Sequence, residues 1–476
     1  MLNFQLILPE IFVLIMTCVV LLADLFIPQR RQGLTYALTQ LTLLGAILLT
    51  LWLYPEKNTT VLHGFVIHDH LTSVLRLTIY ISSIFVFLYS RDYFRQHDMG
   101  KGEPYILGLF TILGMMVLVA AHNFLSIYLG LELMSLPIYA LVALQRDSEQ
   151  ASEAGMKYFI LGALASGLLL YGLSFIYGAT GSLDISTVMH AVMQTPTVHL
   201  FILIFGVVFV VAGLAFKLGV VPFHMWVPDV YTGAPNASTL FIAVAPKVAV
   251  FGMLIRLLVD AMPGLHIQWQ QLFILIALLS MVLGNMVAIV QTNLKRMLAY
   301  STIAHGGYML LGFAAGTPAG FAASMFYTIA YAIMSLGSFG MITLLAKEGF
   351  AAESIEDLRG LNERNPWLAL MLLLLLFSMA GIPPSIGFFA KIGLLEALVG
   401  AHLVWLAAIT LVLAVIGSYY YLNVVKVMYF DKPRNNQPFR IAIDAKIAMS
   451  INGLAVLFFG LFPSSLIHLC RAIFSF

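Results

Sequence analysis

Long apolar runs and short polar connections alternate over the whole length of the chain. A run of about 18 or more apolar residues is long enough to cross a bilayer as a helix, whereas strands of a β-barrel alternate polar and apolar residues. The pattern therefore predicts an all-α polytopic membrane protein with about fourteen transmembrane helices. These spans lie roughly at 4–27, 34–54, 71–90, 105–121, 123–144, 156–178, 199–222, 237–259, 271–291, 297–315, 319–346, 367–397, 403–425 and 447–469.

Two of these spans are interrupted by a Gly-x-x-Pro sequence. Gly219 and Pro222 break the seventh span, and Gly381, Pro383 and Pro384 break the twelfth. A proline inside a helix removes a backbone hydrogen bond, and in lipid the freed carbonyls need protein or water as partners. Helices broken at matching points of two halves indicate a transport site between inverted repeats.

The two breaks lie five spans apart, which is the spacing of a five-helix repeat made of spans 4–8 and 9–13. We therefore predict four segments. They are an N-terminal three-helix segment at 1–104, a first repeat at 105–260, a second repeat at 261–430 and a C-terminal helix at 431–476.

Basic residues predict the orientation of the spans. Of the 24 lysines and arginines, 17 fall in connections on one side and only Lys57, Arg256 and Arg471 on the other. The side rich in Lys and Arg is cytoplasmic by the positive-inside rule. An even number of spans then places both termini on the other side, which is the periplasm if the protein lies in a bacterial inner membrane. The first run, at 4–27, has no basic residue before it and is expected to be a retained helix, not a signal peptide.

Composition narrows the function classes. The chain is 61% hydrophobic and 10% charged, against about 25% charged in a typical soluble domain. Its formal net charge of +2 makes nucleic acid an unexpected partner. The two cysteines cannot complete a four-cysteine iron–sulfur or zinc site, and neither a Gly-x-Gly-x-x-Gly nor a Walker sequence occurs. His68, Asp69 and His70 sit at the edge of an outer loop and could ligate a metal, but no further clustered ligand completes a site, so we expect no metal and no cofactor in this chain.

A few ionisable residues lie at mid-span depth, where each charge costs ~2.5–3.5 kcal/mol on insertion scales. A lysine beside a carboxylate keeps its proton, whereas an unpaired lysine in a dry site loses it. These groups therefore predict a proton path through the membrane, in which Glu132 sets the charge of Lys217. The alternatives are structural ion pairs, lysines that extend to the surface, and a histidine bound to a backbone carbonyl. The predicted path consists of Glu132, Lys217, Lys247, His305 and Lys391.

Further polar residues are weaker candidates. His224 follows the first break, and Tyr300 lies closer to the cytoplasmic end of its span. Lys157 and Lys295 sit at cytoplasmic helix ends, where we expect the side chains to extend to the membrane surface. Glu396 is expected to face the interface at the far end of its span. Arg76 is expected to form a structural ion pair.

Three stretches carry a resemblance to a known family. They are PFHMWVPDVYTGAPNASTLFIAVAPK at 222–247, NLKRMLAYSTIAHGGY at 293–308 and FSMAGIPPSIGFFAK at 377–391. They resemble the antiporter-like membrane subunits of respiratory complex I, an NADH:quinone oxidoreductase, and among these the N-type branch most closely. M-type members tend to carry glutamate where this chain has Lys391. The resemblance covers essentially the whole chain.

The resemblance implies two inverted five-helix repeats, a Glu132–Lys217 pair, a central Lys247 and a terminal Lys391. It implies a non-redox subunit of a proton translocase, with flavin, iron–sulfur clusters and quinone bound by partner subunits. An M-like antiporter subunit and small K-, J- and A-type subunits are the implied neighbours. A subunit of a multisubunit cation/proton antiporter, a subunit of a membrane-bound hydrogenase and a purely structural membrane scaffold are the alternatives.

Overall fold

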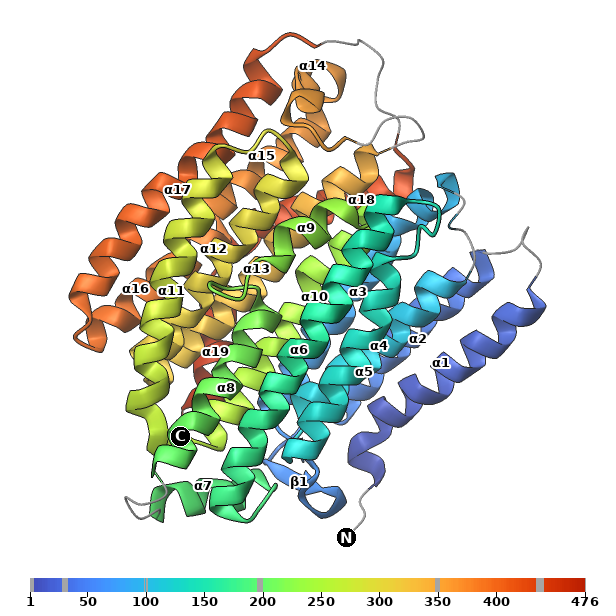
Figure 1. Cartoon of the computed structure of the whole chain (residues 1–476). Coiled ribbons are helices and arrows are strands. Elements are labelled where there is room, and N and C mark those ends of the chain that lie inside the picture. Colours follow the sequence, from blue (N-terminus) through green and yellow to red (C-terminus); the bar gives the residue numbers. More distant parts are fainter. Residues whose placement is uncertain are drawn as a thin grey trace. The chain divides into compact units, whose positions relative to one another are not determined.

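The computed structural model describes residues 4–27, 33–97, 99, 102–194, 200–346, 352–433 and 441–475. Nearly all of the ordered elements are helices, which Figure 1 colours along the sequence. In chain order they are η1 (Phe4–Ile7), α1 (Leu8–Phe26), α2 (Gly33–Trp52), β1 (Thr59–Val61), η3 (Leu62–Gly64), β2 (Val66–His68), α3 (His70–Gln96), α4 (Glu103–Ala120), α5 (Phe124–Val142), α6 (Glu149–Thr180), α7 (Ile185–Gln194), α8 (Leu200–Leu218), α9 (Trp226–Gly233), α10 (Asn236–Leu254), η5 (Ile255–Asp260), η6 (Pro263–Leu265), α11 (His266–Ile289), α12 (Leu294–Ala315), α13 (Pro318–Leu345), η7 (Ile355–Leu358), α14 (Leu361–Arg364), α15 (Pro366–Ala380), α16 (Ile386–Gly400), α17 (Val404–Phe430), α18 (Ile443–Leu461) and α19 (Ser464–Phe474).

The predicted fold class is confirmed. Among the described residues, twelve helices are long and apolar enough to cross a membrane. The other two predicted spans correspond to α12 and to the half-helices α15 and α16. The short helices α7, α9, α14 and α19 were not predicted, because none contains an apolar run long enough to span. Six basic residues used for the orientation lie outside the described residues: Arg30, Arg31, Lys101, Lys347, Arg434 and Arg440.

The helices group into two compact units. Unit 1 consists of Met1–Phe87, Asp98–Leu218 and Ala245–Leu272, and unit 2 consists of Leu88–His97, Gly219–Val244 and Phe273–Phe476. The predicted repeats begin at residues 105 and 261, and the C-terminal helix begins at 431. These boundaries mark segments expected to repeat one another, whereas the units mark segments that pack together, so the repeats stay a prediction.

In unit 1, α4 packs against α5 and α6 packs against α8. Glycines bring α4 and α5 together, because a Cβ atom at Gly114 would lie 2.2 Å from the backbone nitrogen of Met134. Small residues at helix contacts allow this close approach in membranes. The tight contact fixes the position of α5, the helix that carries Glu132.

In unit 2, α13 is buried along most of its length and packs against α12, α15, α16, α18 and α19. Helix α12, which carries His305, is likewise buried on nearly every face. The polar side chains of these two helices therefore lie among protein atoms and not against lipid.

Both predicted helix breaks are confirmed. Helix α8 ends at Leu218, just before Gly219, whose φ is +73°, and α15 ends at Ala380, just before Gly381, whose φ is +86°. Glycine is suited to this left-handed conformation, which ends a helix. The prolines follow directly, and the Val221–Pro222 and Pro383–Pro384 bonds are cis. Each break leaves the last carbonyls of its first half-helix without helical partners.

Candidate functional site

The amine of Lys217 is buried near the end of α8, in unit 1. Its side chain is 8% exposed, and the Nζ atom donates to the hydroxyl of Ser135 at 2.8 Å and to that of Tyr139 at 3.3 Å. Both hydroxyls belong to α5. Neutral hydroxyls satisfy the amine but do not neutralise its charge, so the protonation of Lys217 depends on charges nearby.

Glu132 lies on the same helix as the two hydroxyls, three residues before Ser135. Residues three apart share one face of a helix, so the carboxylate stands beside the Lys217 contacts. No direct ion pair joins Glu132 and Lys217 among the described residues, and the Oε1 atom of Glu132 is buried without a hydrogen-bond partner there. The predicted pair is therefore not in direct contact in this structure. Its role as a switch stays a prediction.

Lys247 is the central lysine of unit 1 and is 2% exposed. It follows Pro246 in α10, and its Nζ atom donates to the backbone carbonyl of Leu218 at 2.6 Å. Leu218 is the last residue of α8, so this carbonyl is one that the first break freed. The negative end of the α8 dipole also favours a cation at this position.

Lys391 occupies the corresponding place in unit 2. From α16 its Nζ atom donates to the carbonyls of Met379 and Ala380, at 2.9 and 2.8 Å. These carbonyls end α15 at the second break. Each break thus has a lysine whose amine binds the freed carbonyls of the preceding half-helix. In the first break this lysine is Lys247, whereas the sequence pattern singled out Lys217.

His305 lies in unit 2 between two tyrosines. Its Nδ1 atom is 2.6 Å from the hydroxyl of Tyr327, and its Nε2 atom is 3.0 Å from the hydroxyl of Tyr421. The hydroxyl of Tyr421 also bonds to Ser301. A histidine with hydroxyls on both ring nitrogens can accept a proton on one side and give one up on the other. These contacts do not fit the alternative in which His305 binds only a backbone carbonyl.

Tyr308 connects the surroundings of His305 with Lys391. Its ring stacks on Tyr327, with the centroids 5.8 Å apart, and the Nζ atom of Lys391 lies 5.3 Å from its centroid. The ring of Tyr308 is also 6.1 Å from that of His305. His305 and Lys391 therefore belong to one buried aromatic and polar cluster in unit 2.

The weaker candidates lie in different settings. The expectation that Lys295 extends to the surface is wrong, because its side chain is 2% exposed. Its Nζ atom donates to the carbonyl of Ala234 at 2.6 Å and lies 3.3 Å from a carboxylate oxygen of Glu353. Because Ala234 is the C-cap residue of α9, Lys295 caps the C-terminal end of that helix. Lys157 is exposed and pairs with Glu153 at 2.8 Å, as expected for a lysine at the surface.

His224 and Tyr300 are only partly buried. His224 lies in the turn between α8 and α9, and its carbonyl accepts a hydrogen bond from Val227. Tyr300 lies on α12, one and a half turns before His305. Among the residues that the structure describes, neither side chain forms a hydrogen bond or ion pair with the lysines of the path, and their roles stay predictions.

In the described part of unit 1, two buried charge clusters lie outside the predicted path. Arg76 pairs with Glu10, which confirms the expected structural ion pair. Arg256 pairs with Asp69 at 2.7 Å and with Asp260 at 2.9 Å. Burial raises the pKa of Asp69, but the Arg256 guanidinium and hydrogen bonds from Thr72 outweigh it and hold this pKa below its usual value. The described residues contain no group of three His, Cys, Asp or Glu side chains placed to bind a metal ion.

Comparison with known proteins places the chain in a family. The model of the transmembrane family described as NADH:quinone oxidoreductase/Mrp antiporter matches residues 121–417. The chain is 54% identical over 478 aligned positions to NADH-quinone oxidoreductase subunit N of Coxiella burnetii (strain RSA 493 / Nine Mile phase I), with 99% of each chain covered.

Solved structures agree with this match. A chain of respiratory complex I from Thermus thermophilus superposes with a TM-score of 0.83 at 29% identity, over 97% of this chain and 99% of that one. A chain of the membrane-bound sulfane sulfur reductase, an archaeal respiratory membrane complex, gives a TM-score of 0.85 at 24% identity. That match covers 98% of this chain and 96% of the other, and it shows a shared fold.

Proposed function

Because the chain belongs to the family of NADH-quinone oxidoreductase subunit N, we propose that it is a non-redox, proton-translocating subunit in the membrane arm of such an enzyme. It lies in a bacterial inner membrane with both termini in the periplasm and moves protons from the cytoplasm outward. Flavin, iron–sulfur clusters and quinone are bound by partner subunits. An M-like antiporter subunit and small K-, J- and A-type subunits are its neighbours in the membrane.

One observation carries the proposal: at each helix break a lysine amine, buried at Lys247 and half-buried at Lys391, binds the freed carbonyls. Lys247 does so at Leu218, and Lys391 at Met379 and Ala380. These carbonyls favour the protonated amine through hydrogen bonds and the helix dipole. A small shift of a half-helix withdraws these carbonyls and leaves the ammonium with fewer hydrogen-bond acceptors, which favours loss of the proton. Each break can therefore act as a switch that loads and unloads a lysine.

With the predicted orientation of the spans, the proposed path runs from the cytoplasm to the periplasm. Protons enter from the cytoplasm near Lys217, whose hydroxyl partners lie beside Glu132, and continue to Lys247. They then pass through His305 and leave toward the periplasm near Lys391. Moving one charge against 100 mV requires about 2.3 kcal/mol. That energy comes from quinone reduction elsewhere in the enzyme and reaches this chain through its partner subunits.

The lysine-rich path favours protons over sodium. Sodium sites use several oxygen ligands, whereas Glu132 is the one carboxylate on the predicted mid-membrane path and three of the other four groups are lysines. A cation/proton antiporter subunit therefore fits the site less well. A purely structural scaffold does not explain why three lysines, two of them buried and Lys391 half-buried, lie in membrane-spanning helices at a high energetic cost.

The test uses the assembled enzyme in membrane vesicles. Lys217→Ala and Glu132→Ala should each lower NADH-driven proton uptake into the vesicles and the coupled reduction of quinone. Lys57→Ala changes an exposed lysine outside the path and serves as the matched control. Assembly is checked on native gels, and rates are expressed per assembled enzyme. Full pumping by an assembled Lys217→Ala enzyme would remove this residue from the path.

A further inference from the structure

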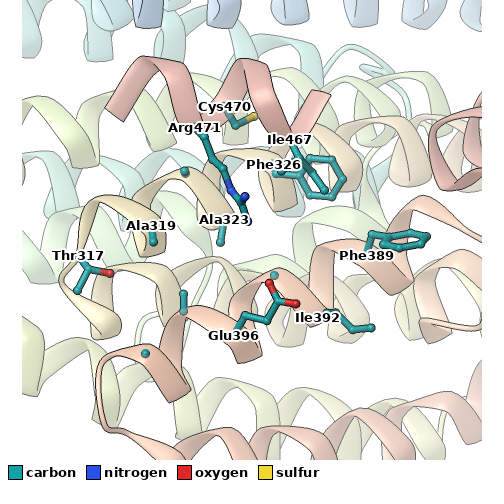
Figure 2. Close-up of a pocket in the computed structure, with 14 residues that line it drawn as sticks. Thr317, Ala319, Ala323, Phe326, Phe389, Ile392, Glu396, Ile467, Cys470 and Arg471 are labelled. Atoms are coloured by element: carbon teal, nitrogen blue, oxygen red, sulfur yellow. The ribbon is translucent and has the colours of Figure 1, made fainter. Parts of the chain in front are cut away.

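Two cavities lie on neighbouring faces of α16 in unit 2. We call the first the lysine cavity; it has a volume of about 250 Å³, and its lining includes Lys391, Ile392, Tyr308 and Thr410. We call the second the outer cavity; it has a volume of about 360 Å³ and lies between α13, α16 and α19 (Figure 2). Its lining includes Ala323, Phe326, Ile392, Glu396, Gly400 and Arg471.

Ile392 lines both cavities and is therefore the wall between them. Lys391 and Glu396 are five residues apart on α16, so they are separated by about 7.5 Å along the helix axis and by roughly 140° around it. The two side chains cannot exchange a proton directly. A proton can pass between them only along water that bypasses the Ile392 side chain, because proton transfer requires donor and acceptor within hydrogen-bond reach or joined by water.

The lysine cavity is lined by a hydroxyl group, that of Thr410, which can bind water. The hydroxyl of Thr410 is buried, with its residue 3% exposed, and has no hydrogen-bond partner among the described residues. Buried polar groups of this kind are usually satisfied by ordered water. Water bound there lies in the same cavity as the amine of Lys391.

The outer cavity contains two opposite charges. Glu396 extends from α16 and Arg471 from α19, and their charged ends point toward one another (Figure 2). Both residues are exposed, as expected for Glu396 at the far end of its span, so the outer cavity is open to the surface of the chain. Neither side chain forms an ion pair with another described residue. The remaining lining is mostly apolar, with the small residues Ala319, Ala322, Ala323, Gly393 and Gly400 leaving the space open. Glu396 carries the only carboxylate among the side chains that line the outer cavity, and this carboxylate can accept a proton.

We propose that the outer cavity is the proton exit of unit 2 and that Glu396 is its proton-accepting group. This inference rests on the proposed function. The ammonium of Lys391 gives its proton to water in the lysine cavity and becomes a neutral amine. The proton passes along water beside Ile392 to the carboxylate of Glu396, which becomes a carboxylic acid. Glu396 then gives the proton to water on the periplasmic side and returns to a carboxylate, and Lys391 is reprotonated from the His305 side.

Arg471 has a different role in this scheme. It is a fixed positive charge on the wall opposite Glu396. Positive charges at a pore lining oppose the entry of protons and cations. The guanidinium therefore disfavours the entry of other cations from the periplasm into the outer cavity.

The experiment compares variants of the assembled enzyme reconstituted in vesicles that report proton transport. Glu396→Gln keeps the shape of the side chain and removes the proton acceptor, whereas Glu396→Asp keeps a carboxylate in the cavity. Proton-transferring groups contribute ~10²–10⁴-fold to rate, so Glu396→Gln should slow proton transport at least about tenfold. Glu396→Asp should retain most of the transport. Glu56→Gln, at an exposed carboxylate of the loop after α2, is the matched control.

Lys391→Ala separates this inference from the proposed function. If Lys391→Ala loses transport and Glu396→Gln keeps it, the exit through Glu396 is overturned and the proposed function stands. If Lys391→Ala keeps transport, the proposed function itself fails. Equal losses in Glu396→Asp and Glu396→Gln would also overturn the role of the carboxylate. If Glu396→Gln does not assemble, Ala323→Leu fills the outer cavity from the opposite wall, and normal transport by that variant overturns the exit.

Discussion

Replacing Lys247 with methionine separates the structural role of this lysine from its role in transport. The amine is 2% exposed and donates to the carbonyl of Leu218 at 2.6 Å. Methionine has a similar length and no charge. It leaves the carbonyl at the end of α8 without its lysine partner.

The two energetic effects of Lys247→Met nearly cancel. Losing a hydrogen bond from a charged donor costs about 1.5–3 kcal/mol. Removing a charge from the middle of a membrane helix recovers about 2.5–3.5 kcal/mol on insertion scales. The net change is therefore within about 1–2 kcal/mol of zero, and the variant should assemble to nearly the normal amount. Proton transport, which needs a group that binds and releases a proton, should be lost.

The assay combines native gels, which measure assembly, with a pH-sensitive dye that measures proton uptake into vesicles after addition of NADH. Lys247→Arg provides a second comparison, because arginine keeps the positive charge but does not release its proton in proteins. It should assemble and fail to transport. Normal transport by either assembled variant would refute the reasoning. Failure of Lys247→Met to assemble would refute the energetic argument, because it would show that the carbonyl contact outweighs the cost of the buried charge.

Three further predictions concern the surroundings of these lysines. Tyr327→Phe removes the hydroxyl 2.6 Å from His305 and should lower proton transport several-fold with normal assembly, measured in the same vesicles. Asp69→Asn leaves the buried guanidinium of Arg256 without its closest partner and should destabilise unit 1 by about 3–5 kcal/mol, measured as a lower thermal unfolding temperature. Burial and the nearby Arg256 lower the pKa of His122, so the folded state favours neutral imidazole. The resulting stability is present above the ordinary histidine pKa of about 6.5 and is lost as the pH falls toward the folded-state value. Thermal unfolding should therefore occur at lower temperature below about pH 6.5, and His122→Gln should weaken this dependence.

The fold class and the helix breaks could be predicted from the sequence because local chemistry decides them. An apolar run of spanning length has few options in a bilayer other than a helix. Gly219 and Gly381 adopt the left-handed conformation, and the prolines that follow prevent the helix from continuing. Residues near each other in sequence determine both features.

The partners of the lysines could not be predicted, because they depend on which segments pack together. Leu218 and Lys247 are 29 residues apart, and nothing in either segment alone specifies their contact. Sequence proximity pointed to Lys217 as the lysine of the first break, whereas its amine binds hydroxyls of α5. Lys295 looked like a surface lysine because it lies at a helix end, and the packing of α9 buries it.

A polar periodicity could have found some of the missed residues. Ser135 and Tyr139 follow Glu132 at intervals of three and four residues, which places all three on one face of α5. Tyr327 and Tyr331 lie four residues apart on α13, and their ring centroids are 5.9 and 5.2 Å from that of His305. In a membrane helix such a stripe indicates contact with protein or water, because polar groups avoid the lipid.

We propose that this chain carries protons across the membrane through Lys217, Lys247 and Lys391. The most direct test is the number of protons translocated per NADH oxidised by the reconstituted enzyme carrying Lys391→Met, compared with the unaltered enzyme. We expect the assembled variant to translocate fewer protons per NADH, or NADH oxidation to slow together with pumping. An unchanged rate of oxidation with an unchanged number of protons per NADH would contradict transport through Lys391.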